Sequence, residues 1–397
     1  LGLPHPSTHI QPWLRGILPR FTKQRAYKTG GRELVNTSIF AMAGLTKTLL
    51  SSILLCLWAG LVSGLTSTLQ QVTNFGSNPT NVGMYVYKPT TVAAKPAVIV
   101  AIHECTASGP GYFTGSPYAQ LADTYGFIVI YPSSPHSGTC WDVSSKATLT
   151  HNGGGDSNGI ANMVTYAIST YNADATRIFA TGSSSGAMMT NVLCATYPEL
   201  WRAATVYSGV AAGCFVSSTG GVDAWNSTCA LGQIDDTQQQ WANVVHAMYP
   251  GYTGSYPPIQ EYHGTADTTL YPPNLNEEVK EWAGVFGYNA AAPTSVLQNT
   301  PLSGYTKSIY GPNLEGILAQ GVGHTVPIQG NEDLKWFGIV PGGEGGSGGS
   351  STTPTGPTST SSTTSAPAST SSAPTGTVPE WGQCGGIGWT GGTVWCV

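Results

Sequence analysis

Continuous apolar runs alternate with helical patterns through the middle of this chain, and that alternation restricts the fold more than any other feature. The runs PAVIVAI at 96–102 and GFIVIY at 126–131 hold too few polar residues for a sheet with one wet face, so they are expected to be strands buried on both faces. After the second run, at 156–171, apolar residues recur at helical spacing. Buried strands separated by helices predict an α/β protein, with a mostly parallel sheet and helices on both faces.

The same alternation continues toward the C-terminus, and the 156–171 helix has Asp156 or Ser157 available as its N-cap. Strands are expected at 177–181, 203–207 and 259–262, and helices at 185–197, 274–286 and 331–337.

Composition divides the chain into five segments. Residues 342–378 are almost entirely Gly, Ser, Thr, Pro and Ala, with Glu344 as the one charge, so they have nothing to bury and are expected to form an extended linker. The linker separates a body at 65–341, sized for one α/β domain, from a short segment at 379–397.

The N-terminal region is typical of a secretory signal peptide. The first methionine is Met42, Lys47 is followed by an apolar stretch at 49–62, and small residues end it at Gly64. We therefore expect a signal peptide at 42–64, a secreted, extracellular protein, and translated upstream sequence at 1–41. A basic targeting extension is the alternative for 1–41; a membrane anchor is disfavoured because a bilayer span needs about 20 apolar residues.

The charge of the chain excludes several partners. Only 9% of the residues are charged, and residues 65–397 hold 8 Lys/Arg against 19 Asp/Glu, a net charge of −11. An acidic surface disfavours nucleic acid and anionic membranes as partners. No pattern indicates an interface, so a monomer is expected.

Because disulfides form in oxidising compartments, the predicted secretion makes disulfide bonds between the cysteines expected. The body contains five, an odd number that leaves at least one thiol unpaired. Connectivity does not follow from sequence; our hypothesis pairs Cys214 with Cys229 and Cys105 with Cys140, with Cys194 free in a helix. No cysteine and histidine cluster has zinc spacing, so no metal is expected. Asn226 begins an Asn-Ser-Thr sequon and is a predicted glycosylation site.

A serine nucleophile is indicated at Ser184. The segment GSSSG at 182–186 matches the G-x-S-x-G pattern, as does GGSGG at 345–349 in the linker. Only the first match follows a predicted strand and opens a predicted helix, the sharp turn that exposes a serine hydroxyl at the end of a sheet. The alternative is a serine-rich turn without chemistry.

A serine nucleophile needs a base, and the base needs an acid to orient it. In α/β-hydrolases the chain order is serine, acid, histidine. Asp267 follows the predicted strand at 259–262, and His324, in a glycine-rich loop, is the one histidine that comes after it. Ser184, Asp267 and His324 are therefore the predicted catalytic residues, although Asp267 alone could cap a loop and His324 alone could be a surface side chain.

An acyl-transfer site also needs hydrogen-bond donors for the developing oxyanion. The backbone N–H of Ser185 at the start of a helix is one candidate. The second is expected in the loop after the 96–102 strand, where we favour the N–H of Cys105. His103 in that loop precedes Ser184 and is interpreted as a structural residue.

Other chemistries find little support. No dinucleotide or P-loop fingerprint is present. A glycosidase that uses a pair of carboxylates is a further alternative. Glu104, Asp142 and Asp156 are available for it, but nothing in the sequence singles out a pair.

Four segments carry a family resemblance: GSSSGAMMTN at 182–191, YSGVAAGC at 207–214, HGTADTTL at 263–270 and GHTVP at 323–327. They resemble the fungal acetylxylan esterases of carbohydrate esterase family 1, which are related to feruloyl and polyhydroxybutyrate depolymerase-like esterases. The resemblance spans roughly 68–340. It implies an α/β-hydrolase that removes acetyl groups from xylan without metal or cofactor, with the nucleophile, acid and base at the positions named above.

The C-terminal segment WGQCGGIGWT at 381–390 resembles the small fungal cellulose-binding module of carbohydrate-binding family 1. That module is held by two disulfides, whereas only Cys384 and Cys396 are present here, so a truncated module at 379–397 with at most a weak contact to cellulose is expected.

The leading functional hypothesis is a secreted acetylxylan esterase acting through an acetyl-enzyme. A feruloyl or short-chain polyester esterase on the same triad is the first alternative, separated by the size of the acyl pocket. An inactive cellulose-surface binder is the second. Trp141, Tyr207 and the segment 212–258 are hypothesised to shape the substrate site.

Overall fold

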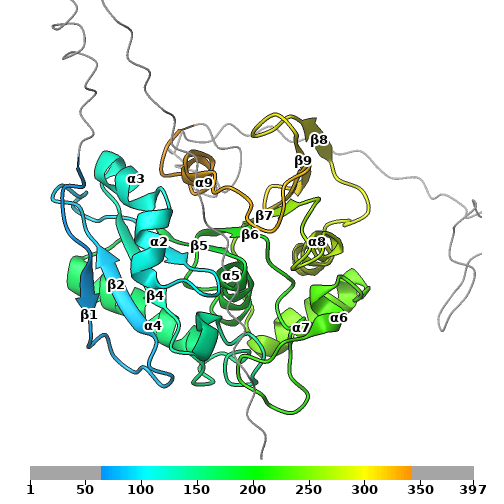
Figure 1. Cartoon of the computed structure of the whole chain (residues 1–397), viewed down its shortest axis with the longest axis horizontal. Coiled ribbons are helices and arrows are strands. Elements are labelled where there is room, and N and C mark those ends of the chain that lie inside the picture. The colour runs from blue at the N-terminus through cyan, green and yellow to red at the C-terminus, as the bar shows by residue number, and fades with distance from the viewer. Residues whose placement is uncertain (1–63, 342–397) are drawn as a thin grey trace, which may run out of the picture. The chain divides into compact units, whose positions relative to one another are not determined.

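A ten-stranded sheet forms the centre of the molecule in a computed structural model that describes residues 64–341 (Figure 1). Contacts divide the chain into residues 1–68 and 69–397, and every element below belongs to the second unit. The predicted signal peptide and upstream sequence, the linker, the C-terminal module, and Cys56, Cys384 and Cys396 lie outside the described residues.

The strands follow the order β1-β2-β4-β3-β5-β6-β7-β10-β9-β8 across the sheet. The six consecutive strands β4, β3, β5, β6, β7 and β10 run parallel to one another, and antiparallel pairings extend the sheet at both edges. The predicted mostly parallel sheet is thereby confirmed. The strands are β1 Gln70–Val72, β2 Gly83–Tyr87, β3 Val98–Ile102, β4 Ile128–Ser133, β5 Ile178–Ser183, β6 Ala203–Tyr207, β7 Ile259–Gly264, β8 Ser295–Gln298, β9 Tyr305–Gly311 and β10 Leu314–Ala319.

The helices contact one another in two groups, α2 with α3 and α9, and α4 with α5, α7 and α8, and they cover both faces of the sheet (Figure 1). They are α2 Gly109–Gly115, α3 Tyr118–Tyr125, α4 Asp156–Tyr171, α5 Ser185–Thr196, α6 Ser227–Ala230, α7 Gln238–Met248, α8 Pro273–Phe286 and α9 Gly330–Trp336, with a 3₁₀ turn at Ser137–Thr139. No helix of the described residues is long and apolar enough to cross a membrane.

Alternation along the central strands supplies both faces with apolar side chains. In β3, Val98 and Val100 join the main core cluster on the side of α4 and α5, and every residue of the strand is buried. In β5, Ile178 packs into the same cluster, while Phe179 points the other way and stacks on Phe337 at 4.7 Å between ring centroids. This two-sided burial explains why these strands have no polar alternation in sequence.

Sequence patterns located the strands from β3 to β7 and four of the helices, but missed both edges of the sheet and strand β10. The predicted helix at 156–171 and strand at 203–207 match α4 and β6. The N-cap prediction for α4 was wrong: Gly155 is the N-cap and Asp156 is the first helical residue, because its side chain instead accepts hydrogen bonds from His136 and Asp142 N. Strands β1, β2, β8, β9 and β10 and helices α2, α3, α6 and α7 were not predicted.

Helix α5 is buried along its whole length. It begins directly after β5 in the middle of the sheet, so the turn that joins them lies at the carboxyl ends of the parallel strands. Ligands of open α/β sheets bind at that edge. The loops that follow β3, β7 and β10 meet at the same edge, and they carry the remaining predicted site residues.

Candidate active site

The turn between β5 and α5 holds Ser184 in an unusual backbone conformation, with φ 54° and ψ −120°. Such a conformation costs a non-glycine residue about 1–3 kcal/mol and is retained where the surroundings enforce it. A Cβ on Gly182 would lie 2.2 Å from Gly186 O, and a Cβ on Gly186 would lie 2.1 Å from Ile102 O. The two glycines therefore allow the tight turn, as the G-x-S-x-G pattern indicated.

Ser184, His324 and Asp267 form one chain of hydrogen bonds. His324 Nε2 lies 2.7 Å from Ser184 Oγ, and His324 Nδ1 lies 2.7 Å from Asp267 Oδ2. Because a carboxylate only accepts, Nδ1 carries the hydrogen and Nε2 is free to accept the serine proton. The structure thus brings together the three residues that chain order had selected, across 140 residues of sequence.

Asp267 is held as an anion. Its Oδ1 accepts from the backbone N–H groups of Thr269 and Leu270 at 2.8 and 3.0 Å. Although burial favours the neutral acid, hydrogen bonds from His263 and His324 hold the pKa of Asp267 well below its usual range. An ionised, fixed carboxylate orients the imidazole and favours its protonated form during reaction.

Cys105 and Ser185, the predicted oxyanion donors, both line the cavity beside Ser184. Within the described part of the chain, neither backbone N–H is used in a turn or loop hydrogen bond. Cys140 and Trp141 connect the loop that carries Cys105 to the start of α5 at Ser185. Cys105 is bonded to Cys140, Trp141 N donates to Ser185 Oγ at 2.7 Å, and Trp141 Nε1 donates to His103 O at 2.8 Å.

His103 has the structural environment expected of it. Its ring is fully buried, its Nε2 accepts from Ser134 N at 3.1 Å, and its Nδ1 lies 2.6 Å from Glu104 O. Burial lowers the pKa of His103 despite the bond to Glu104 O. The neutral imidazole therefore joins the loop after β3 to the end of β4 through hydrogen bonds.

The cavity over Ser184 has a volume of about 920 Å³ and an apolar lining. It extends between two groups of residues, one from α2 and α3 and one from the loops after β6 and β10. Phe215 and Trp225 of the second group fall within the segment 212–258 that was hypothesised to shape the substrate site. Trp225 at its rim is 61% exposed and packs edge-on against Phe215. The first group includes Tyr112 and Gln120, and the second includes Phe215, Trp225, Val326 and Ile328.

Trp141 and Tyr207 both border the cavity, but each side chain is only 1% exposed. The Tyr207 hydroxyl donates to Asp333 Oδ1 at 2.5 Å and accepts from Gln329 N at 3.0 Å. The indole of Trp141 is likewise engaged with His103 O. Any contact of these two residues with substrate is therefore limited to the small exposed part of each ring.

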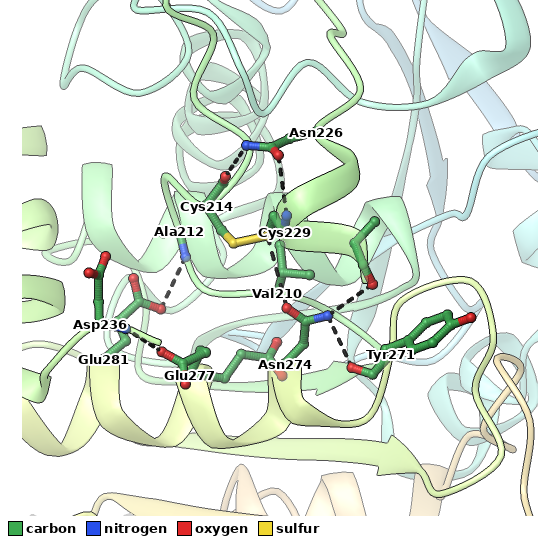
Figure 2. Close-up of a disulfide and its surroundings, with 12 residues drawn as sticks. Val210, Ala212, Cys214, Asn226, Cys229, Asp236, Tyr271, Asn274, Glu277 and Glu281 are labelled. Carbon is green, nitrogen blue, oxygen red and sulfur yellow. Dashed lines mark hydrogen bonds between the residues drawn. A yellow bond between two sulfur atoms is a disulfide. The ribbon is translucent and has the colours of Figure 1, made fainter. Parts of the chain in front are cut away.

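The disulfide hypothesis is confirmed. Cys105 pairs with Cys140, Cys214 pairs with Cys229, and Cys194 is a buried free thiol in α5. Asn226, the sequon residue, caps α6 beside the second disulfide (Figure 2). Its Nδ2 donates to Cys214 O at 3.0 Å and its Oδ1 accepts from Cys229 N at 3.2 Å.

No group of three or more His, Cys, Asp or Glu residues within 64–341 is arranged to hold a metal ion. The three carboxylates considered for a glycosidase have different environments. Glu104 lines the cavity, whereas Asp142 accepts several hydrogen bonds from the 144–145 turn and Asp223 N, and Asp156 binds His136. These bonds give Asp142 and Asp156 a structural explanation.

The fold and this hydrogen-bonded array are those of an α/β-hydrolase. A family model described as esterase PHB depolymerase matches residues 82–269. "Probable acetylxylan esterase A" of Neosartorya fischeri is 64% identical over 327 residues, covering 82% of this chain and 86% of that protein. "Acetylxylan esterase A" of Talaromyces purpureogenus is 61% identical over 329 residues, covering 82% and 86%.

Among solved structures, "Acetyl xylan esterase from Aspergillus awamori" superposes with a TM-score of 0.69 at 63% sequence identity, covering 69% of this chain and all of that one. The chain belongs to the family of the fungal acetylxylan esterases. The resemblance inferred from the four motifs is thereby confirmed for the catalytic body.

Proposed function

We propose that this protein is a secreted serine esterase that removes acetyl groups from acetylated xylan. The observation that carries the proposal is the hydrogen-bonded series from Ser184 Oγ through His324 to Asp267. Identity above 60% to fungal acetylxylan esterases supports the substrate. Secretion rests on the signal-like segment at 42–64 and on the two disulfides.

In the proposed reaction, Ser184 Oγ attacks the acetyl carbonyl while its proton passes to His324 Nε2. The N–H groups of Cys105 and Ser185 are proposed to stabilise the oxyanion of the tetrahedral intermediate. His324 then protonates the departing sugar oxygen, leaving an acetyl-enzyme. A water molecule gives a proton to His324 and attacks the acetyl carbon, acetate departs, and the serine hydroxyl is restored.

A feruloyl or short-chain polyester esterase is the second candidate. A cavity of about 920 Å³ is larger than an acetyl group requires, and the exposed Trp225 at its rim offers an apolar surface. In the acetylxylan proposal that room takes xylose units, with Trp141 and Tyr207 bordering the site. In the alternative it takes the aromatic acyl group.

Native plant xylan carrying both acetyl and feruloyl esters separates these candidates. Wild type and Ser184→Ala would be incubated with it, and free acetate and ferulate quantified. We expect the wild type to release acetate and the Ser184→Ala variant to release none. Ferulate as the main product moves the protein to the second candidate. Acetate release that persists with Ser184→Ala contradicts both candidates and favours a different nucleophile.

The remaining expectations concern the mature protein. We propose an N-glycan at Asn226, because its Nδ2 has two hydrogens and the bond to Cys214 O needs one of them. A monomer, no metal or cofactor, and at most weak cellulose contact through 379–397 also remain proposals. Size-exclusion chromatography, enzymatic deglycosylation and a cellulose pull-down of the secreted protein test them.

A further inference from the structure

A second histidine lies on the far side of Asp267. His263 is in β7, and its Nε2 is 3.3 Å from Asp267 Oδ2, the same oxygen that lies 2.7 Å from His324 Nδ1. The side chains of His263 and Asp267 are both completely buried. Asp267 Oδ2 is therefore placed between two imidazoles, of which only the one from His324 has a role in the reaction proposed above.

The Nε2 atom of His263 carries a hydrogen. It lies 2.8 Å from Leu270 O, and a carbonyl oxygen can only accept. The N–H group is therefore shared between Leu270 O and Asp267 Oδ2. Since Leu270 N in turn donates to Asp267 Oδ1, the imidazole fixes the carboxylate and the short loop after β7 together.

The other nitrogen of this ring faces a carboxylate. His263 Nδ1 is 3.9 Å from Glu278 Oε2 in α8, and both atoms are buried without a hydrogen-bond partner. The second oxygen of Glu278 accepts from Asn191 Nδ2 at 3.0 Å. An unprotonated Nδ1 would place two acceptors against each other in a dry interior, whereas a proton on Nδ1 gives the carboxylate a counter-ion.

Three further ionisable groups of β7, α8 and α5 lie in this part of the interior. Burial and the neighbouring carboxylates raise the pKa of Glu261 in β7, and burial likewise raises the pKa of Glu281 in α8 and of the Cys194 thiol in α5. Burial opposes a charged His263, but Asp267 and Glu278 together raise its pKa to about 9.

We propose that His263 is a positioning residue for the active site: a buried imidazolium that fixes and ionises Asp267, with Glu278 as its counter-ion. The inference rests on the proposed catalytic roles of Ser184, His324 and Asp267. A cation beyond Asp267 opposes a second positive charge on His324, so the base stays unprotonated, and the enzyme stays active, at lower pH.

Two variants that preserve shape test this role through the pH profile of kcat/KM on a chromogenic acetyl ester. In Glu278→Gln, the amide N–H can donate to His263 Nδ1 and keep the ring neutral. In His263→Gln, the amide keeps a donor toward Leu270 O without charge. Both are expected to move the acid limb of the profile to higher pH by about half a unit or more, with no further movement in the double variant.

Glu281→Gln is the matched control, because Glu281 is equally buried in α8 but accepts from Ala212 N, in the segment next to the Cys214–Cys229 disulfide (Figure 2). Its acid limb is expected to coincide with that of the wild type. A purely structural His263 would lower thermal stability in the two test variants and leave their acid limbs unmoved, which would overturn the proposal.

A spectroscopic measurement does not depend on either variant retaining activity. In wild type labelled with ¹⁵N-histidine, the His263 ring is expected to show both nitrogens protonated at pH 7, its signals assigned by their loss in His263→Gln. A neutral ring at pH 7 overturns the inference while leaving the role of Ser184 intact. Full activity of Ser184→Ala, by contrast, contradicts the proposed function whatever the charge of His263.

Discussion

The hydroxyl of Ser185 provides a quantitative test of how the nucleophile turn and the loop carrying Cys105 are held together. It accepts from Trp141 N at 2.7 Å in a fully buried position. Ser185→Ala removes this acceptor and leaves a buried N–H without a partner, which costs about 1–3 kcal/mol. For a domain of this size each kcal/mol shifts Tm by roughly 2–4 °C, so a decrease of about 5 °C is expected.

The same substitution is expected to lower kcat while KM changes little. Trp141 follows Cys140, which is cross-linked to Cys105, so relaxation around the unpaired N–H is expected to displace the Cys105 N–H, the second proposed oxyanion donor. The backbone N–H of Ser185 itself remains. The loss should therefore be smaller than the roughly 10²–10³-fold effect of deleting an oxyanion donor outright.

Thermal unfolding and steady-state kinetics on a chromogenic acetyl ester measure both quantities. Ser169→Ala is the control, because this serine is exposed on α4 and its hydroxyl bonds only to Tyr166 O in the same helix. Ser185→Ala matching that control in both Tm and kcat would refute the view that this hydrogen bond organises the site.

Three further predictions concern the nucleophile turn, a buried carboxyl group in α9 and the free thiol. Gly186→Ala should give insoluble or inactive protein, because its Cβ would lie 2.1 Å from Ile102 O; soluble expression with activity assays checks this. Burial raises the pKa of Asp333 to about 7 although Tyr118 and Tyr207 donate to it, so the folded protein retains a proton that the unfolded chain releases near pH 4. Stability should therefore decrease from about pH 4 to 7, and Asp333→Asn should remove that part of the decrease in urea-unfolding curves. Cys194 is completely buried, and burial raises the pKa of its thiol, so a thiol reagent should modify it only after unfolding; stoichiometric labelling of native protein would contradict this.

The central elements were predictable because their burial is nearly complete. Strand β3 is apolar throughout, and α4 has one apolar face, so simple periodicity locates both. Strands β8 and β9 escaped because they lie at the sheet edge with polar or exposed side chains, such as Lys307 and Gln298, and resemble loops. The strand preference of such half-exposed residues depends on the side chains packed around them, which the local pattern does not reveal.

The site divides in a similar way. Ser184, Asp267 and His324 could be picked out as the proposed catalytic residues because chain order and strand ends restrict where such residues lie, and the structure places the three within hydrogen-bond distance. His263 belongs to the same HGTAD motif, yet its relation to Glu278 depends on how α8 packs against β7, and it became visible only in three dimensions. The same is true of Asp333, whose two tyrosine partners come from α3 and β6.

The most direct test of the central claim is stoichiometric labelling by an organophosphate ester, which transfers its phosphoryl group to an activated serine. We expect one adduct per molecule, mapped to Ser184 by peptide mass spectrometry, with esterase activity lost in proportion to labelling. Ser184→Ala should take up no label. Labelling of another residue, or full activity in completely labelled protein, would contradict the assignment of Ser184, His324 and Asp267 as the catalytic residues.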